Sequence, residues 1–139
     1  YHGVNSRMDE LQAIILNEKL KTFSEEQRKR AKIIKYYLKH IRNKVVELPI
    51  VKKGFLHAWH LFVIKTSSRN KLMKYLNKNG IQTMLHYPIP PYRQKMYKKS
   101  KIKSKTFSDN LNKKLLSLPV NSSLSLKEAK YVVDKINSF

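Results

Sequence analysis

The chain has 139 residues, no cysteine, and a formal net charge of +21, with 30 Lys and Arg against 9 Asp and Glu. This length suffices for one domain that buries roughly two thirds of its unfolded surface. The lack of cysteine excludes a disulfide framework and a thiolate metal site. No apolar run approaches the roughly 20 residues of a membrane-spanning helix, and no secretory signal opens the chain. We therefore expect a cytoplasmic protein without a membrane partner.

The excess of positive charge is typical of proteins that bind nucleic acid. Lysine is far more frequent than arginine, and the lysines are spread over every expected helix and loop, with the densest run from Lys95 to Lys105. Arginines at base-reading positions and paired aromatic residues on strands are not visible. We interpret the charge as a solvated lysine-rich surface and expect no nucleic-acid partner. A basic nucleic-acid-binding α+β module remains the alternative.

The stretch from residue 3 to 16 predicts a polar turn that feeds a helix. Asn5 and Ser6 are residue types whose side chains cap helix N-termini. Apolar residues follow at helical spacing and predict one buried face: Met8, Leu11, Ile15 and Leu16. We expect a first helix over 8–20 and a break at Thr22 and Phe23.

A second helix is expected over 24–41, because Ser24 and Gln27 have the spacing of a capping box. Its buried face is predicted to consist of residues at steps of three and four: Ala31, Ile34, Tyr37, Leu38 and Ile41. The two helices would form a long antiparallel or angled pair.

The remainder of the chain predicts a small α+β layer. Short β-rich segments at 45–48, 57–65 and 81–86 are expected to be its strands. Helices are expected over 68–79 and 108–116, with an extended connector at 118–120 between the latter and the final helix. The final helix follows a capping box of Ser125 and Glu128, with its apolar side formed by Ala129, Val132, Val133 and Ile136.

Residues 5–13, Asn-Ser-Arg-Met-Asp-Glu-Leu-Gln-Ala, closely resemble a signature of the DegT/DnrJ/EryC1/StrS family. Members of this family are pyridoxal-phosphate (PLP) sugar aminotransferases of the aspartate-aminotransferase fold type. Further blocks match in family order: His-Ala-Trp-His-Leu-Phe-Val at 57–63, His-Tyr-Pro-Ile-Pro-Pro at 86–91 and Leu-Ser-Leu-Pro at 116–119. The resemblance covers essentially the whole chain, and it implies that the chain begins in the middle of such an enzyme.

The fold implied by the resemblance is the C-terminal domain of a fold-type-I PLP enzyme. We expect an α+β fold in which helices cover a small three-stranded sheet and a long helix pair precedes it. Residues 1–43 would form a helical segment at the domain and dimer junction, and residues 44–139 the small α+β domain. The full-length parent would be a homodimer.

The resemblance also implies a function, the transfer of an amino group to a nucleotide-linked keto-deoxy-sugar, with glutamate as the expected donor. The products would serve surface-polysaccharide or glycoside biosynthesis. Transamination needs a lysine that holds the PLP aldehyde and shuttles the proton. In this family that lysine lies upstream, and no lysine of this chain stands in the corresponding motif. We therefore expect no catalytic residue here, and this chain alone should be inactive.

Four site residues are carried over from the resemblance. Asn5 is expected to reach the cofactor phosphate of the other subunit, a role that suits a neutral amide at a helix start. Arg7 is expected to bind a carboxylate or phosphate of the substrate with its forked guanidinium. His86 and Tyr87, at the end of a strand, resemble nucleotide-sugar contacts. Without the motif, Asn5 would be read as an N-cap, Arg7 as a surface charge and His86 as a strand-end residue.

The loop departs from the family at two positions. The family often has His-Tyr-Pro-x-Pro-x-His, whereas this chain has Tyr92 at the last position. An imidazole contact is therefore lost. At the next position, where the family commonly has an apolar residue, this chain has Arg93. No metal site is expected, because His57 and His60 point to opposite faces if they lie on a strand. A non-catalytic remnant or dimerisation domain is a further alternative.

Overall fold

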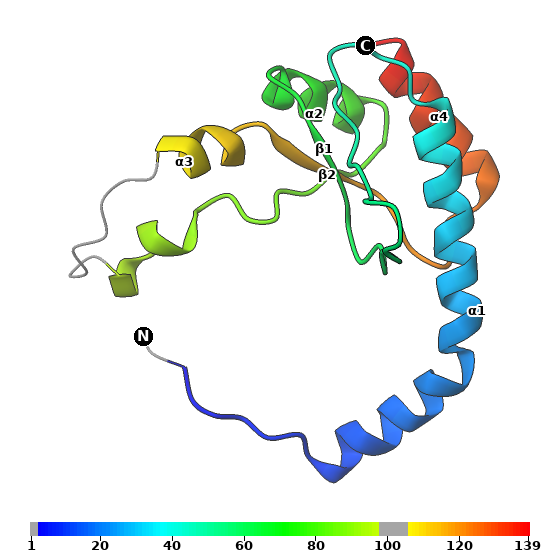
Figure 1. Ribbon diagram of the computed structural model, residues 1–139, viewed down its shortest axis with the longest axis vertical. Coiled ribbons are helices and arrows are strands. Elements are labelled where there is room, and N and C mark those ends of the chain that lie inside the picture. Colours follow the sequence, from blue (N-terminus) through cyan, green and yellow to red (C-terminus); the bar gives the residue numbers. More distant parts are fainter. Residues whose placement is uncertain (1–2, 98–105) are drawn as a thin grey trace.

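The computed structural model describes residues 3–97 and 106–139. In chain order the elements are α1 (Glu10–His40), β1 (Phe62–Lys65), α2 (Arg69–Lys78), the 3₁₀ turns η1 (Pro91–Arg93) and η2 (Lys95–Tyr97), α3 (Thr106–Asn112), β2 (Leu115–Leu118) and α4 (Leu126–Asn137). Figure 1 shows α1 along one side of the molecule, with α3 and the segment of η1 and η2 reaching away from it. Most of the basic run from Lys95 to Lys105 lies outside the described residues.

The expected helix pair is wrong: residues 10–40 form one continuous helix, α1. The expected break fails because neither Thr22 nor Phe23 is Gly or Pro, and each costs only a few tenths of a kcal/mol to about 0.7 kcal/mol in a helix. The Thr22 hydroxyl donates a hydrogen bond to the Lys19 carbonyl at 3.2 Å without interrupting the helix. Figure 1 shows that α1 bends along its length rather than breaking.

The start of α1 also differs from the prediction. Its N-cap is Asp9, whose carboxylate accepts a hydrogen bond from the Gln12 N–H at 2.7 Å, while the Gln12 side chain accepts from the Asp9 N–H. This is a complete capping box. Asn5 and Ser6 lie in the irregular segment before it, so neither of them caps the helix.

The two halves of α1 have different surroundings. Ile33, Ile34 and Tyr37 of the C-terminal half are buried, together with Ile41 just beyond it, whereas Ala31 and Leu38 are half-buried. The predicted burial of the N-terminal face is wrong within this chain. Its side chains are exposed: Met8 by 62%, Leu11 by 74%, Ile15 by 57% and Leu16 by 48%.

The sheet of the described residues has two strands rather than the three expected. β1 and β2 pair antiparallel with Phe62 opposite Leu118. The segments predicted as further strands contribute one bridge each, Glu47 to Lys65 on one edge and Met84 to Ser117 on the other. The predicted strand at 57–65 is shortened because Trp59 has a φ of 51°, which an extended strand does not permit.

One hydrophobic core joins the C-terminal half of α1 to the sheet, α2 and α4. Phe62 and Ile64 of β1 are fully buried, as are Leu72 and Leu76 of α2. The predicted apolar face of α4 is confirmed, since Ala129, Val132, Val133 and Ile136 are all buried. Among the described residues no helix is long and apolar enough to cross a membrane.

Asn137 ties the end of α4 to the end of α1. Its side-chain oxygen accepts a hydrogen bond from the Arg42 N–H at 2.8 Å, and its amide donates to the His40 carbonyl at 2.9 Å. Asn43 donates in turn to the Ile136 carbonyl at 2.8 Å. The bonds to the His40 and Ile136 carbonyls satisfy groups of the kind that a helix C-terminus leaves without an intrahelical partner.

Candidate functional site

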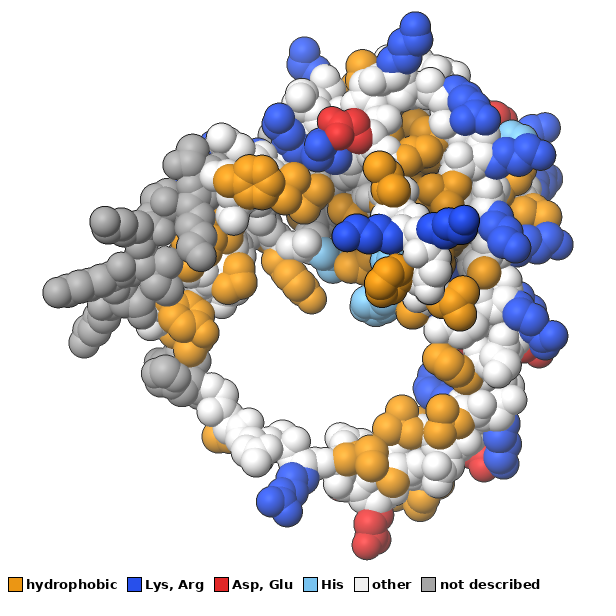
Figure 2. Space-filling model, in the orientation of Figure 1, with side chains coloured by type: hydrophobic (Ala, Val, Ile, Leu, Met, Phe, Trp, Pro, Cys, Tyr) orange, Lys and Arg blue, Asp and Glu red, His pale blue; other side chains and the backbone are white. Residues whose placement is uncertain are grey.

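The four predicted site residues lie on two segments. Asn5 and Arg7 precede α1, and His86 and Tyr87 follow the Met84 bridge at the edge of the sheet. Within the described part of the chain, no hydrogen bond, ion pair or ring contact joins the two pairs. Figure 2 shows an opening between the N-terminal half of α1 and the rest of the molecule, with apolar side chains along its edge. The structure of this chain therefore does not bring the four residues into one contact cluster.

Asn5 and Arg7 are exposed in an irregular segment. Neither side chain has a hydrogen-bond partner among the described residues, so the donors of the amide and of the guanidinium are available to another molecule. Both are donor types suited to a phosphate or carboxylate. The prediction that Asn5 acts from a helix start is wrong, because the cap is at Asp9. The donor set still fits the phosphate of a cofactor such as PLP.

His86 is held by the second strand of the sheet. Its Nδ1 lies 2.9 Å from the Ser117 Oγ, and its ring meets the Tyr87 ring edge-on with centroids 5.7 Å apart. Because Ser117 occupies one ring nitrogen, the other, Nε2, is the imidazole atom that a ligand would contact. Tyr87 is 73% exposed, and its carbonyl accepts a hydrogen bond from the Asn112 amide at 2.8 Å. This pair thus offers one anchored ring and one exposed ring.

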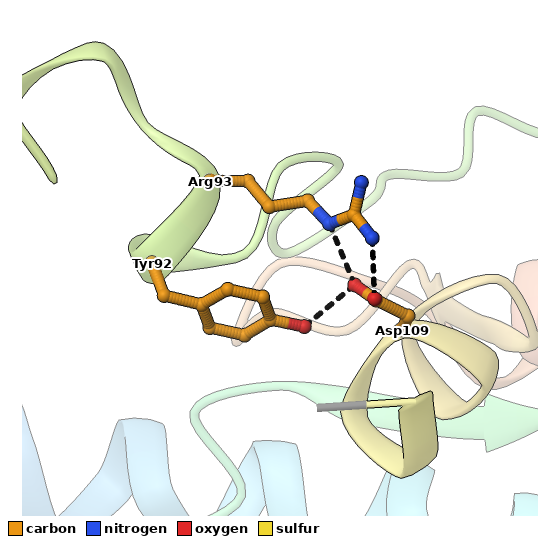
Figure 3. A network of polar contacts seen from close by, with 3 residues as sticks. All are labelled: Tyr92, Arg93 and Asp109. Carbon is orange, nitrogen blue, oxygen red and sulfur yellow. Dashed lines mark hydrogen bonds and ion pairs between the residues drawn. The ribbon is translucent and has the colours of Figure 1, made fainter. Parts of the chain in front are cut away.

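Figure 3 shows a polar network that joins the loop after Tyr87 to α3. The Asp109 carboxylate accepts a hydrogen bond from the Tyr92 hydroxyl, and Arg93 donates to its two oxygens from Nε at 2.9 Å and from the terminal guanidinium nitrogen Nη2. The hydrogen bond to Asp109 raises the pKa of the Tyr92 phenol, and the same carboxylate raises the pKa of Arg93. Tyr92 stands at the position where the motif that this loop resembles often has histidine. In this chain the residue at that position contacts Asp109 of α3.

Sequence reasoning missed Asp109 as part of this region. The residue was only one polar position in a predicted helix at 108–116, of which α3 forms Thr106–Asn112. A signal was present, because Asp109 is the single acidic residue between Glu47 and Glu128. In a stretch so rich in basic residues, a single carboxylate is an expected hydrogen-bond or ion-pair partner for Tyr92 and Arg93.

Other candidates carry less chemistry. His57 bonds locally, with its Nδ1 2.8 Å from the Trp59 backbone nitrogen, and the described residues include no group of three metal-ligating side chains. A hollow of about 680 Å³ lies between Ile81 and α4 and contains none of the four predicted site residues. A smaller hollow of about 220 Å³ lies between the loop residues Pro88 and Arg93 and Asn112 of α3.

Comparison with known proteins gives a consistent result. The chain is 40% identical over 139 residues to a dTDP-3-amino-3,6-dideoxy-alpha-D-galactopyranose transaminase of Aneurinibacillus thermoaerophilus, covering 100% of this chain and 38% of that protein. It is 34% identical to a 3-oxo-glucose-6-phosphate:glutamate aminotransferase of Bacillus subtilis, covering 95% of this chain and 32% of that protein. The chain therefore spans less than half the length of these relatives.

Solved structures give the same picture. The fold matches the crystal structure of Streptomyces venezuelae DesV in complex with a ketimine intermediate, with a TM-score of 0.88 and 28% identity over 99% of this chain and 38% of that one. It also matches the crystal structure of NtdA from Bacillus subtilis with bound cofactor PMP, with a TM-score of 0.81 and 31% identity over 96% of this chain and 33% of that one. The family model of the DegT/DnrJ/EryC1/StrS aminotransferases matches residues 1–137. The chain belongs to the DegT/DnrJ/EryC1/StrS aminotransferase family.

Proposed function

We propose that this chain is the C-terminal part of a PLP-dependent aminotransferase that transfers an amino group, from glutamate, to a nucleotide-linked keto-deoxy-sugar. The observation that carries the proposal is the agreement with the family along residues 1–137, together with the match of the fold to DesV over 99% of the chain. The whole protein would serve surface-polysaccharide or glycoside biosynthesis in the cytoplasm. The division into a junction segment, 1–43, and a small domain, 44–139, stays a prediction.

In this proposal Asn5 and Arg7 bind anions. The Asn5 amide donates to the cofactor phosphate, and the Arg7 guanidinium donates to a carboxylate or phosphate of the substrate. Their exposure and lack of partners among the described residues support this assignment. When bound, PLP supplies the electron sink for transamination. The lysine that holds it would come from outside this chain, so residues 1–139 alone should be inactive.

His86 and Tyr87 would bind the nucleotide-sugar. The hydrogen bond between His86 Nδ1 and the Ser117 hydroxyl restricts rotation of the imidazole, so β2 determines where Nε2 lies. The exposed Tyr87 ring offers a flat surface and a hydroxyl to a base or sugar. Both residues therefore bind and orient the substrate, and neither transfers a proton in this proposal.

The exposed apolar face of α1 supports a partner surface. Leu11, Ile15 and Leu16 are about half exposed or more in this chain, and an apolar stripe of this kind is rarely left in water. We propose that the large domain and the second subunit of a homodimer cover it. Light scattering of the whole protein at several concentrations tests this point, and a monomer throughout would contradict it.

The first test is the visible absorption spectrum of the protein produced from its native gene with any upstream coding sequence, after PLP is added. We expect a cofactor band that borohydride bleaches. An Asn5→Ala variant should bind PLP about tenfold to a hundredfold more weakly, since a hydrogen bond to a charged group contributes about 1.5–3 kcal/mol. Asn77→Ala, on the exposed side of α2, is the matched control and should not change PLP affinity.

Two outcomes would contradict the proposal. A protein without the cofactor band would remove the PLP function altogether. A band that is present and equally strong in the Asn5→Ala and Asn77→Ala variants would remove only the role of Asn5. Turnover of glutamate with a panel of keto-sugars on dTDP and UDP then identifies the substrate.

A further inference from the structure

We propose that Asp109 is a positioning residue that holds the loop of residues 86–93 in the conformation that binds the nucleotide-sugar. This inference deepens the proposed function and rests on it. Asp109 lies on α3, outside the loop, and would not touch the substrate. It would act through Tyr92 and Arg93, the two residues at which this chain departs from the family motif.

The loop has little apolar anchorage of its own. Neither η1 nor η2 contains a buried residue, and Tyr87 and Ile89 are 73% and 54% exposed. The hollow of about 220 Å³ between Pro88, Arg93 and Asn112 separates part of the loop from α3. Among the described residues, the contacts that oppose the conformational entropy of this weakly packed loop are therefore its specific polar contacts.

Three polar contacts hold the loop to the described body of the protein. The first is His86 to Ser117 on β2. The second is the amide of Asn112, which donates to the Tyr87 carbonyl. These two fix the beginning of the loop. The third joins Tyr92 and Arg93, at the end of the loop, to Asp109 of α3, as Figure 3 shows.

The Asp109 contact is the most specific of the three. One carboxylate accepts from a phenol and from two nitrogens of a guanidinium. The fork of arginine fixes direction as well as distance, so a bidentate pair restricts the loop more than a single bond does. The Asp109 side chain is only 12% exposed, compared with 55% for Arg93. The acidic partner is thus sheltered by the fold, and the cation is the member that comes from the loop.

The expected effect of losing the Asp109 contact follows from the fraction of molecules whose loop is in the binding conformation. If the released loop holds its binding conformation about a tenth of the time, the apparent affinity for the nucleotide-sugar falls about tenfold. The half-reaction with the amino donor does not use the loop and should be unchanged. Asp109→Ala should therefore raise KM for the nucleotide-sugar with little change of kcat or of the rate with glutamate.

The test uses the whole holoenzyme and compares Asp109→Ala, Asp109→Asn and Glu47→Ala. The amide introduced by Asp109→Asn retains an acceptor for the Tyr92 hydroxyl, so the KM of this variant should lie between those of wild type and Asp109→Ala. Glu47→Ala is the matched control, because it removes a carboxylate that pairs with Lys65 at the other edge of the sheet. Amide hydrogen exchange over residues 86–97 provides a readout that does not depend on activity. It should accelerate most in Asp109→Ala and stay unchanged in Glu47→Ala.

The outcomes separate this inference from the proposed function. Faster exchange of the loop with an unchanged KM for the nucleotide-sugar would overturn the positioning role. Equal loss in both half-reactions, or faster exchange throughout α2 and α4, would also overturn it, because Asp109 would then be a general stabilising residue. A wild-type protein without transaminase activity would refute the proposed function, and exchange of residues 86–97 would still decide whether Asp109 holds the loop.

Discussion

The contrast between the two halves of α1 predicts that the same substitution has very different effects at two positions of one helix. Ile34 is 1% exposed in the core, and Ile15 is 57% exposed on the N-terminal face. We consider replacing each of them with alanine. Both changes gain the same intrinsic helix propensity, a few tenths of a kcal/mol to about 0.7 kcal/mol, so the difference between them isolates burial.

The magnitude follows from the carbon atoms removed. At Ile34, loss of three buried carbons costs about 2.4 kcal/mol at about 0.8 kcal/mol each, and the cavity left behind brings the total into the range of about 2–5 kcal/mol. At Ile15 less than half of the side chain is covered and no cavity forms. The propensity gain then offsets most of the loss, and the change in unfolding free energy should stay within about 0.5 kcal/mol.

Urea unfolding of the 139-residue chain, followed by circular dichroism at several protein concentrations, measures both values. An Ile15→Ala variant destabilised as much as Ile34→Ala at the lowest concentration would refute the reasoning. It would mean that the N-terminal half of α1 is packed in the isolated chain. In the whole protein we expect the cost at Ile15 to rise, because the proposed large domain and second subunit would cover that face.

Three further predictions concern hydrogen bonds made by Tyr37, Ser125 and Asn137. Burial raises the pKa of Tyr37, so its stabilising contribution is complete below its ordinary pKa of about 10 and is lost as pH rises above it. Tyr37→Phe should lower the free energy of unfolding by about 1–3 kcal/mol, since the Pro119 carbonyl loses its donor. The variant should also show a smaller decrease of Tm with rising alkaline pH than the wild type, and an equally steep decrease would contradict this. Ser125→Ala should cost about 1 kcal/mol as a lost N-cap. Hydrogen bonds from Ser125 lower the pKa of Glu128, so stability falls as pH drops through that lowered value. Ser125→Ala should therefore make Tm less dependent on pH in the acid range, and an unchanged acid dependence would count against this prediction. Asn137→Ala should cost about 1–3 kcal/mol by leaving helix-end groups unpaired, and an unchanged urea midpoint would rule out that cap.

The helices that close on this chain's own core were predictable from the sequence. The capping box at Ser125 and the spacing of the apolar residues predicted the buried face of α4. The spacing of Leu72 and Leu76 predicted the buried face of α2 in the same way. The same periodicity failed at Leu11 and Ile15, because a hydrophobic stripe says that a face will be covered and not by which molecule. Helix continuity at Thr22 was missed since weak helix formers do not break a helix flanked by strong ones.

The sheet and the loop were harder to predict. The β-rich segments at 45–48 and 81–86 each form a single bridge, because strand propensity does not specify how far two segments run side by side. The residues named for the site came from the family motif. The motif does not show that, among the described residues, no contact joins Asn5 and Arg7 to His86 and Tyr87. Asp109 was missed since its partners, Tyr92 and Arg93, are brought to it only by the fold.

The bonds that Asn137 makes with the end of α1 join residues 95 and 97 positions apart, and the bond from Tyr37 to Pro119 spans 82. Contacts of such long range form slowly, because the intervening chain must lose its freedom before they stabilise anything. During synthesis, the apolar side chains at 33–41 leave the ribosome long before α4 does. Nascent chains of this protein therefore carry an open core until residue 136 is available, and in that interval they are exposed to aggregation.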